Sequence, residues 1–310
     1  MGKTTDRSLE VTYAGIRFST PFLPASGTFG YGFEPANFRA LGCFGGLVTK
    51  GISFKPRHGN NPPRVRETPC GMINSVGLEN PGLDVFISRI LPEMRNSGKP
   101  IIVNLAGHNV EEFAMMIERL NEYDEIKAYE INISCPNVEE GGLEFFKDVK
   151  ILKNLLGTIK RYSTKVNVIK IPPDIFNYNA LMDILLQDGF TRITVANTYP
   201  ATFVDVEEMQ FYFERKNGGL SGSAIYPITL RLVYELKKDY HEVEIIGSGG
   251  VYSAEVAIQY FLAGASLVEI GSVNFVDPNI VCKIKSGVEQ YLLQKGFNSI
   301  SQIVGMLLPK

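Results

Sequence analysis

The chain has 310 residues, 45% of them hydrophobic, and a formal net charge of −2 at pH 7. This length can bury a large core, in one α/β domain or in two smaller ones. The near-neutral charge offers no basic surface for nucleic acid or an anionic membrane, so we expect small molecules and proteins as partners. The N-terminus lacks the apolar core of a signal peptide, and no apolar run is long enough to cross a bilayer, so we expect a soluble cytoplasmic protein.

Two short segments at the start, residues 9–13 and 16–18, alternate in polarity around Ala14 and Gly15. They predict a β-hairpin that plugs one end of a larger fold. Apolar runs of strand length then alternate with amphipathic segments of helix length. The eight runs are residues 22–25, 46–50, 101–105, 129–133, 166–171, 192–196, 244–247 and 267–270. The helical segments are residues 111–120, 152–162, 180–186, 227–236 and 254–262, with a last one after Pro278.

Alternating strands and helices imply a parallel sheet, and eight such units fit a closed (β/α)₈ barrel, the TIM barrel. A doubly wound open sheet is the alternative. No repeat or low-complexity linker divides the chain, so we expect residues 1–310 to form a single domain. The connections 51–83 and 198–227 are too long for simple βα loops. Because both follow strands, we expect them over the C-terminal face of the barrel, where active sites of this fold lie.

The four cysteines, Cys43, Cys70, Cys135 and Cys282, are far apart in the sequence and form no CxxC pair. This spacing argues against a disulfide framework, a zinc site and a self-contained iron-sulfur cluster. We therefore expect no metal site, and we expect all but Cys135 to be small buried apolar residues. Iron-sulfur chemistry would have to come from another chain.

Small or polar residues end every predicted strand, and in a barrel these ends meet at one rim. Glycine, serine and asparagine are common in turns, so any one of them has a structural explanation. Lys50 and Lys170 are different, because burying an ammonium group at the end of an apolar strand is costly unless a polar partner meets it. We expect both lysines to be functional.

The last two strands end in Ile246-Gly-Ser-Gly-Gly250 and Ile270-Gly-Ser272. Glycines there let backbone N–H groups approach an anion, and the loops after strands seven and eight commonly bind phosphate in this fold. We therefore predict a phosphorylated substrate or cofactor. The chain has no GxGxxG motif, so it carries no Rossmann nicotinamide site of its own.

The asparagines Asn74, Asn132, Asn137 and Asn197 form a second polar set. An amide side chain offers donors and an acceptor together, which matches the edge of a cyclic imide or urea, and Lys50 could hold a carboxylate. Cys135 follows the fourth predicted strand directly, beside the glycine-containing loop 139–142. No histidine has a clear claim to be its partner, so the sequence does not favour a papain-like nucleophile, whereas it allows a cysteine that accepts a proton.

Several motifs resemble those of the class 1 dihydroorotate dehydrogenases, over about residues 9–275. They are Pro24-Ala-Ser-Gly27, Thr49-Lys-Gly51, residues 58–64, residues 74–82, Asn132-Ile-Ser-Cys-Pro-Asn137, Gly218-Gly-Leu-Ser-Gly222 and Ile246-Gly-Ser-Gly-Gly250. The resemblance implies an FMN-containing barrel that oxidises dihydroorotate to orotate in pyrimidine biosynthesis. It implies that Cys135 takes a proton from C5 of the substrate while hydride passes from C6 to N5 of the flavin. It also implies that Lys170 stabilises the reduced flavin.

The resemblance assigns binding residues as well. For the substrate they are Lys50, Asn74, Ser75, Val76, Gly77, Leu78, Asn132, Asn137, Asn197 and Thr198. For FMN they are Ser26, Lys50, Gly51, Asn104, Asn132, Lys170, Ala196, Gly222, Gly249, Gly250, Gly271 and Ser272.

Residues 51–82 look like subclass 1B, whose members pass electrons to NAD through a second subunit that carries FAD and a [2Fe-2S] cluster. The resemblance therefore implies a heterotetramer, in which a homodimer of this chain binds such electron-transfer subunits. Subclass 1A, a homodimer that reduces fumarate, and a flavin barrel acting on another dihydropyrimidine are the alternatives.

The chain departs from the family pattern at three places. Residues 171–174 read Ile-Pro-Pro-Asp where Leu-Ser/Thr-Pro-Asn is usual, and residues 199–202 read Tyr-Pro-Ala-Thr where Gly-Met is usual. Glu269 occupies a strand position that is more often neutral. These departures leave the shape of the pocket and the strictness for substrate open.

Overall fold

The computed structural model describes residues 8–34, 38–134, 148–173 and 178–309. Its main sheet has eight strands in the order β3-β16-β15-β10-β9-β8-β7-β4, and every neighbouring pair is parallel. Their bounds are β3 (Phe22–Pro24), β4 (Leu47–Val48), β7 (Ile101–Leu105), β8 (Ile126–Asn132), β9 (Val166–Lys170), β10 (Arg192–Val195), β15 (Glu244–Ser248) and β16 (Ala265–Ile270). The N–H of Gly45 donates to the carbonyl of Phe22 at 2.9 Å, which brings the two edge strands together. The prediction of a (β/α)₈ barrel is confirmed.

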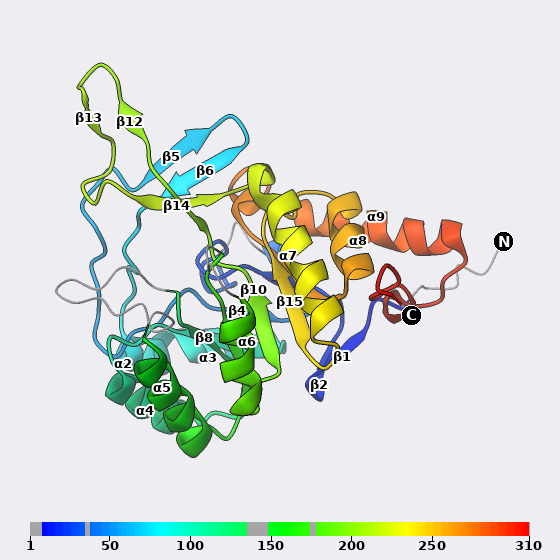
Figure 1. Ribbon diagram of the computed structural model, residues 1–310, viewed down its shortest axis with the longest axis horizontal. Coiled ribbons are helices and arrows are strands. Elements are labelled where there is room, and N and C mark those ends of the chain that lie inside the picture. Colours follow the sequence, from blue (N-terminus) through cyan, green and yellow to red (C-terminus); the bar gives the residue numbers. More distant parts are fainter. Residues whose placement is uncertain (1–7, 35–37, 135–147, 174–177, 310) are drawn as a thin grey trace.

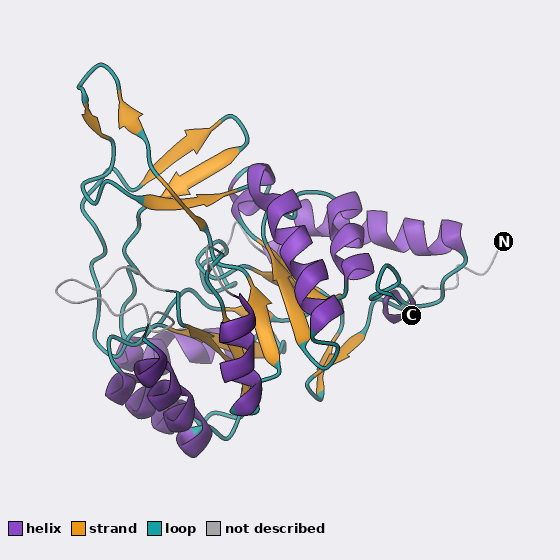
Figure 2. Cartoon of the chain, viewed as in Figure 1, coloured by secondary structure: helices purple, strands orange, loops and turns teal. Residues whose placement is uncertain are grey.

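Helices lie along the outside of this barrel (Figures 1 and 2). Those predicted are all present, and the helical segments are α1 (Phe38–Leu41), α2 (Leu83–Val85), η2 (Phe86–Ile90), α3 (Leu91–Arg95), α4 (Val110–Leu120), α5 (Val149–Tyr162), α6 (Tyr178–Gln187), α7 (Tyr226–Asp239), α8 (Ala254–Ala263) and α9 (Ile280–Lys295). Short 3₁₀ turns are η3 (Ser223–Ile225), η4 (Ser272–Phe275) and η5 (Ile300–Gln302). None of the described helices is long and apolar enough to cross a membrane.

Capping side chains set where several helices begin. The Asn109 side chain accepts the N–H of Glu112 at the start of α4, and the Ser253 side chain accepts the N–H of Val256 at the start of α8. Such caps satisfy N–H groups that the first helical turn leaves without partners. Helix α8 ends at Gly264, whose φ of 112° is a left-handed conformation that favours glycine.

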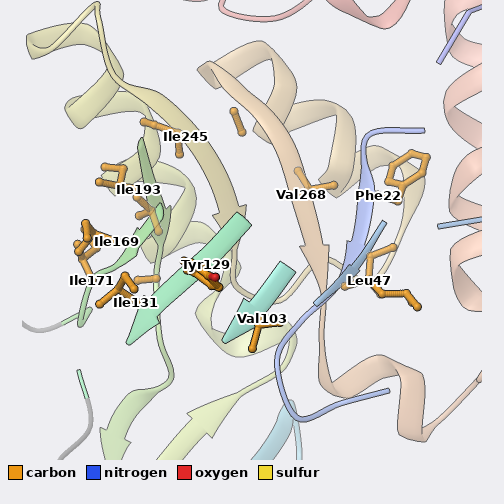
Figure 3. Packing of buried hydrophobic residues seen from close by; sticks show 14 of the residues in the cluster. Phe22, Leu47, Val103, Tyr129, Ile131, Ile169, Ile171, Ile193, Ile245 and Val268 are labelled. Carbon is orange, nitrogen blue, oxygen red and sulfur yellow. The ribbon is translucent and has the colours of Figure 1, made fainter. Parts of the chain in front are cut away.

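Side chains alternate between the two faces of each barrel strand. One set, including Val103, Ile131, Ile169 and Val268, points out and packs with the inner faces of the helices (Figure 3). The other set points into the barrel and forms a second apolar cluster at its N-terminal end, which we call the floor cluster. It contains Tyr13, Phe18, Leu23, Val48, Ile102, Ala128, Val168, Ile246 and Leu267.

Two members of the floor cluster come from the N-terminal hairpin β1 (Val11–Tyr13) and β2 (Ile16–Phe18). Tyr13 and Phe18 are fully buried, and the Tyr13 hydroxyl donates to the carbonyl of Glu244 on β15 at 3.4 Å. The hairpin therefore plugs the N-terminal end of the barrel, as its sequence predicts.

The two long connections form one antiparallel sheet. Its strands are β5 (Val65–Thr68), β6 (Gly71–Asn74), β14 (Gly218–Ser221) and β11 (Tyr199–Ala201), in the order β11-β14-β6-β5. The hairpin β12 (Val204–Asp205) and β13 (Gln210–Phe211) extends beyond it (Figure 1). The sequence predicts that both connections lie on the C-terminal face, but strands this short leave no periodic pattern from which their pairing could be read.

The expectation that Cys43 and Cys282 are simply small buried apolar residues is wrong, because they form a disulfide. Cys43 and Cys282 are joined, with Cα atoms 5.3 Å apart and a sequence separation of 239. The bond links the segment between α1 and β4 to α9, which neighbour each other only because the barrel closes. Cys70 is exposed at the turn between β5 and β6, so the expectation that it is buried is also wrong.

Candidate functional site

A cavity of about 850 Å³ lies at the C-terminal ends of the barrel strands, beneath the sheet formed by the long connections. This volume is in the range of small-molecule and cofactor sites. Every predicted binding residue that the structure describes lines it, namely Ser26, Lys50, Gly51, Asn74, Ser75, Val76, Gly77, Leu78, Asn104, Asn132, Lys170, Ala196, Asn197, Thr198, Gly222, Gly249, Gly250, Gly271 and Ser272. Cys135, Asn137 and the loop 139–142 lie outside the described residues, so their placement stays a prediction.

A layer of polar side chains separates the cavity from the floor cluster. On most strands these side chains come two residues after a floor residue, because inward-facing positions recur with a period of two. All of them are buried, and we call them the polar layer: Asn104, Glu130, Lys170, Thr194, Ser248 and Glu269. Lys170, which the sequence predicts to be functional, is only 5% exposed.

Lys170 is held between two carboxylates. Its Nζ donates to Glu269 Oε2 at 2.9 Å and lies 3.4 Å from the carboxylate of Glu130. Glu130 receives two further hydrogen bonds, from Asn104 Nδ2 at 2.6 Å and from Thr194 Oγ1 at 2.8 Å. These carboxylates offset the free-energy cost of burying the Lys170 ammonium group.

These contacts shift the pKa of all three groups. Burial alone would raise the pKa of Glu130, but the Lys170 ammonium and the hydrogen bond from Asn104 outweigh it and lower the pKa. Burial alone would lower the pKa of Lys170, but the two carboxylates outweigh it and raise the pKa. For Glu269, burial and the nearby Glu130 raise the pKa to about 7, and Lys170 offsets only part of this. A lysine in this setting remains protonated at neutral pH.

Two of the predicted asparagines lie together at the cavity. Asn132 Oδ1 accepts the N–H of Ser134 at 3.1 Å and the Nδ2 of Asn197 at 3.4 Å. Asn197 Oδ1 in turn accepts the N–H of Thr198 at 2.8 Å. No described residue accepts a hydrogen bond from Asn132 Nδ2, which leaves this donor for a ligand.

Residues 74–79 of the segment 74–82 line the cavity. Leu78 has a φ of 57°, a left-handed conformation that is strained for leucine and is typical of functional loops. The buried side chain of Asn80, absent from the predicted set, fixes this segment: its Nδ2 donates to the Leu78 carbonyl at 2.7 Å and to Ser53 Oγ at 2.8 Å. Asn74 Nδ2 donates to the carbonyl of Gly219 at 3.1 Å, which connects the segment to the other long connection.

The glycines predicted to bind FMN have two different reasons to be glycine. A Cβ on Gly250 would lie 2.4 Å from the carbonyl oxygen of Gly222, and one on Gly222 would lie 2.4 Å from the Cα of Gly71. These glycines are therefore required by the close packing of backbone segments. A Cβ on Gly271 would touch only Ala25, at 3.5 Å, so packing does not explain this glycine and an approaching ligand would.

Glu130, Ser248 and Glu269 are functional candidates absent from the predicted set, and the sequence marks Glu269 only as a departure from the family pattern. Glu130 had a visible signal, since it is a charged residue in the middle of the apolar run 129–133. Among the described residues, no three His, Cys, Asp or Glu side chains are grouped so as to hold a metal ion.

Comparison with known proteins places the chain in a family. The family model described as dihydroorotate dehydrogenase matches residues 8–292. Relatives named dihydroorotate dehydrogenase B (NAD(+)), catalytic subunit, include one from Geotalea daltonii, which is 38% identical over 96% of this chain and 98% of its own length. Another, from Caldicellulosiruptor bescii, is 41% identical over 97% of this chain and 99% of its own length.

Solved structures show the same fold. The dihydroorotate dehydrogenase of Eimeria tenella in complex with ferulenol superposes with a TM-score of 0.80 at 23% identity, covering 98% of this chain and 89% of the other. The match in sequence extends over nearly the whole chain, and the structural match includes the barrel that carries the cavity. The chain therefore belongs to the dihydroorotate dehydrogenase family.

Proposed function

We propose that this protein binds FMN and oxidises dihydroorotate to orotate in pyrimidine biosynthesis, as the catalytic subunit of a cytoplasmic enzyme. The observation that carries the proposal is the convergence of Lys50, Lys170 and the asparagines on one cavity, at the C-terminal face of a barrel of this family. A site that bound only a phosphate group would need neither the second lysine nor the amides.

The donors and acceptors of the cavity suit FMN. The buried Oδ1 of Asn104 has no hydrogen-bond partner among the described residues, and Lys170 offers a cation at the same end of the cavity. The ring system of a flavin carries N–H and C=O groups on one edge, which such a pair complements. Gly249, Gly250, Gly271 and Ser272 would hold the phosphate, and bound FMN would supply the hydride acceptor.

The substrate is an imide ring with a carboxylate. Lys50 lines the cavity and forms no ion pair with any described carboxylate, so it is available to hold that group. Asn74, Asn132, Asn137 and Asn197 would bind the ring edges, and the segment 75–78 with Thr198 would cover the ring. Cys135 would act as the base that removes the C5 proton.

The names of the relatives suggest the electron acceptor. Because they are called catalytic subunits of NAD(+) enzymes, we propose that electrons leave through a second subunit carrying FAD and a [2Fe-2S] cluster. The assembly would be a homodimer of this chain with two such subunits. Copurification of a flavin and iron-sulfur protein with this chain from its native host tests this point, and fumarate-supported turnover by the chain alone would contradict it.

The central test is spectroscopic. The purified protein should be yellow, and its visible absorption should bleach when dihydroorotate is added without oxygen. Cys135→Ala should slow this bleaching by about 10²- to 10⁴-fold, the usual contribution of a general base, while Cys70→Ala should not change it. A folded protein that takes up no FMN would contradict the proposal, and unchanged bleaching in Cys135→Ala would remove that residue from the role.

A second candidate is oxidation of another dihydropyrimidine. Pro172, which stands where serine or threonine is usual in the family, lines the cavity. Lys50, which forms no ion pair with a described carboxylate, nevertheless favours a substrate with a carboxylate. Comparing dihydroorotate with dihydrouracil as the reductant decides between them, and faster bleaching by dihydrouracil would favour the second candidate.

A further inference from the structure

The polar layer contains one ammonium group and two carboxylates, so its charges do not balance. Glu130 is well supplied with donors, because Asn104 and Thr194 donate to it in addition to Lys170. Glu269 Oε1 has no hydrogen-bond partner among the described residues, although Glu269 is only 1% exposed. If one of the two carboxylates is to be neutralised by a proton, it is Glu269.

Glu269 is also placed to respond to charge in the cavity, because it lines the cavity wall together with Lys170. Burial and the Glu130 carboxylate raise the pKa of Glu269 from 4.5 to about 7. A buried carboxyl group with a pKa near neutrality gains a proton when negative charge appears next to it.

The groups near Glu269 come from four other barrel strands and from the N-terminal hairpin. Ser248 on β15 and Leu23 on β3 are its neighbours in the sheet, while Glu130 and Lys170 approach from β8 and β9. Tyr13 of the N-terminal hairpin stays protonated, because burial raises its pKa well above 10.0. The other charged residues lining the described part of the cavity are Lys50, Glu79 and Arg215.

We propose that Glu269 is a positioning residue that takes up one proton from solvent when two electrons enter the bound flavin, and returns it on reoxidation. The inference rests on the proposed function, since it requires FMN in the cavity. Two electrons and one proton entering the flavin add one negative charge to the cavity. A second proton then forms an O–H bond at Glu269, which frees Lys170 from one of its two carboxylates, so that its positive charge acts on the flavin.

The test is the midpoint potential of bound FMN, measured by spectroelectrochemistry from pH 6 to pH 9 in the wild type and in Glu269→Gln. Each additional proton taken up changes the reduction equilibrium tenfold per pH unit, which is about 30 mV for a two-electron couple. We expect the two proteins to agree near pH 6. Above about pH 7 the wild-type potential should become more negative than that of the variant by about 30 mV per pH unit. Glu244→Gln, on the neighbouring strand β15 but at the far end of the barrel, is the matched control and should follow the wild type.

A second measurement keeps the inference testable if Glu269→Gln does not fold. Above about pH 7, where Glu269 of the oxidised enzyme has released its proton, the infrared difference spectrum of reduced minus oxidised wild-type enzyme should contain a new protonated carboxyl band. Its absence, or parallel potential curves for the wild type and Glu269→Gln, would overturn the inference while leaving the proposed function intact. A folded preparation without FMN would instead contradict the proposed function.

Discussion

The floor cluster and the polar layer are built on the same strands, only two residues apart, yet one buries apolar side chains and the other buries charged and polar ones. Leu267 and Glu269 lie on β16, and Val168 and Lys170 lie on β9. The first member of each pair is fully buried among apolar side chains, and the second is buried among charged and amide groups. Both positions of each pair face the inside of the barrel, so the difference between their surroundings is set by the side chains.

The floor cluster stabilises the barrel, whereas the polar layer destabilises it. Burial of apolar side chains in the floor cluster stabilises the fold directly. Burial of Glu130, Lys170 and Glu269 is costly, and even complete pairing does not make it better than an apolar replacement. A layer of this kind is therefore expected where chemistry needs it, and here it forms the base of the cavity.

The largest effect is expected when the polar layer loses its cation. Lys170→Met leaves two buried carboxylates without a counter-ion, so we expect the free energy of unfolding to fall by about 3–5 kcal/mol and flavin reduction by dihydroorotate to be lost. Urea denaturation and anaerobic stopped-flow absorbance measure the two effects. Lys165→Met, just before the same strand and in a loose 3.9 Å pair with Asp124, is the control. Equal destabilisation by both variants would show that the two close carboxylates do not set the cost of removing Lys170.

A cavity in the floor cluster should affect stability without affecting chemistry. Leu267→Ala removes a fully buried side chain, so we expect a loss of about 2–5 kcal/mol in the free energy of unfolding. The rate of flavin reduction per folded molecule should be unchanged. A slowed reduction in this variant would mean that packing in the floor cluster affects the chemistry at the polar layer.

The pH dependence of stability should isolate Glu269. Its folded pKa of about 7 lies above its ordinary value of 4.5, so between these values the folded state holds a proton that the unfolded state has released. Stability should therefore fall as pH rises from 4.5 to 7, by up to about 1.4 kcal/mol per pH unit from this group. Urea denaturation at pH 5 and pH 7 measures the slope, which should be smaller in Glu269→Gln. An identical slope in the variant would exclude this group as its source.

The smallest effect is expected at the hydrogen bond between the hairpin and the barrel. The bond from the Tyr13 hydroxyl to the Glu244 carbonyl is long, at 3.4 Å. Tyr13→Phe keeps the packing of the ring, so we expect a loss of at most about 1 kcal/mol, measured as a shift in Tm. A much larger loss would mean that this hydroxyl, and not apolar packing, fixes the plug.

Much of the fold could be predicted from the sequence, because barrel strands and helices leave strong periodic patterns. The strand ends also indicated the cavity, since parallel strands bring their C-terminal ends to one rim. The Cys43–Cys282 bond and the pairing of β6 with β14 could not be predicted, because both depend on contacts between segments distant in the sequence. The pairing of Lys170 with Glu130 and Glu269 was missed for the same reason, although the alternation of inward-facing positions would have placed all three inside the barrel.

The antiparallel sheet over the cavity has a consequence for how this protein can change. Asn74 and Gly219 pair through their backbones, and the Asn74 side chain adds a further hydrogen bond to the same partner. An insertion or deletion in either long connection would shift the register of the other and displace Asn74 from the cavity. The two connections are therefore expected to evolve together. Variants with a new substrate preference should carry compensating changes in both.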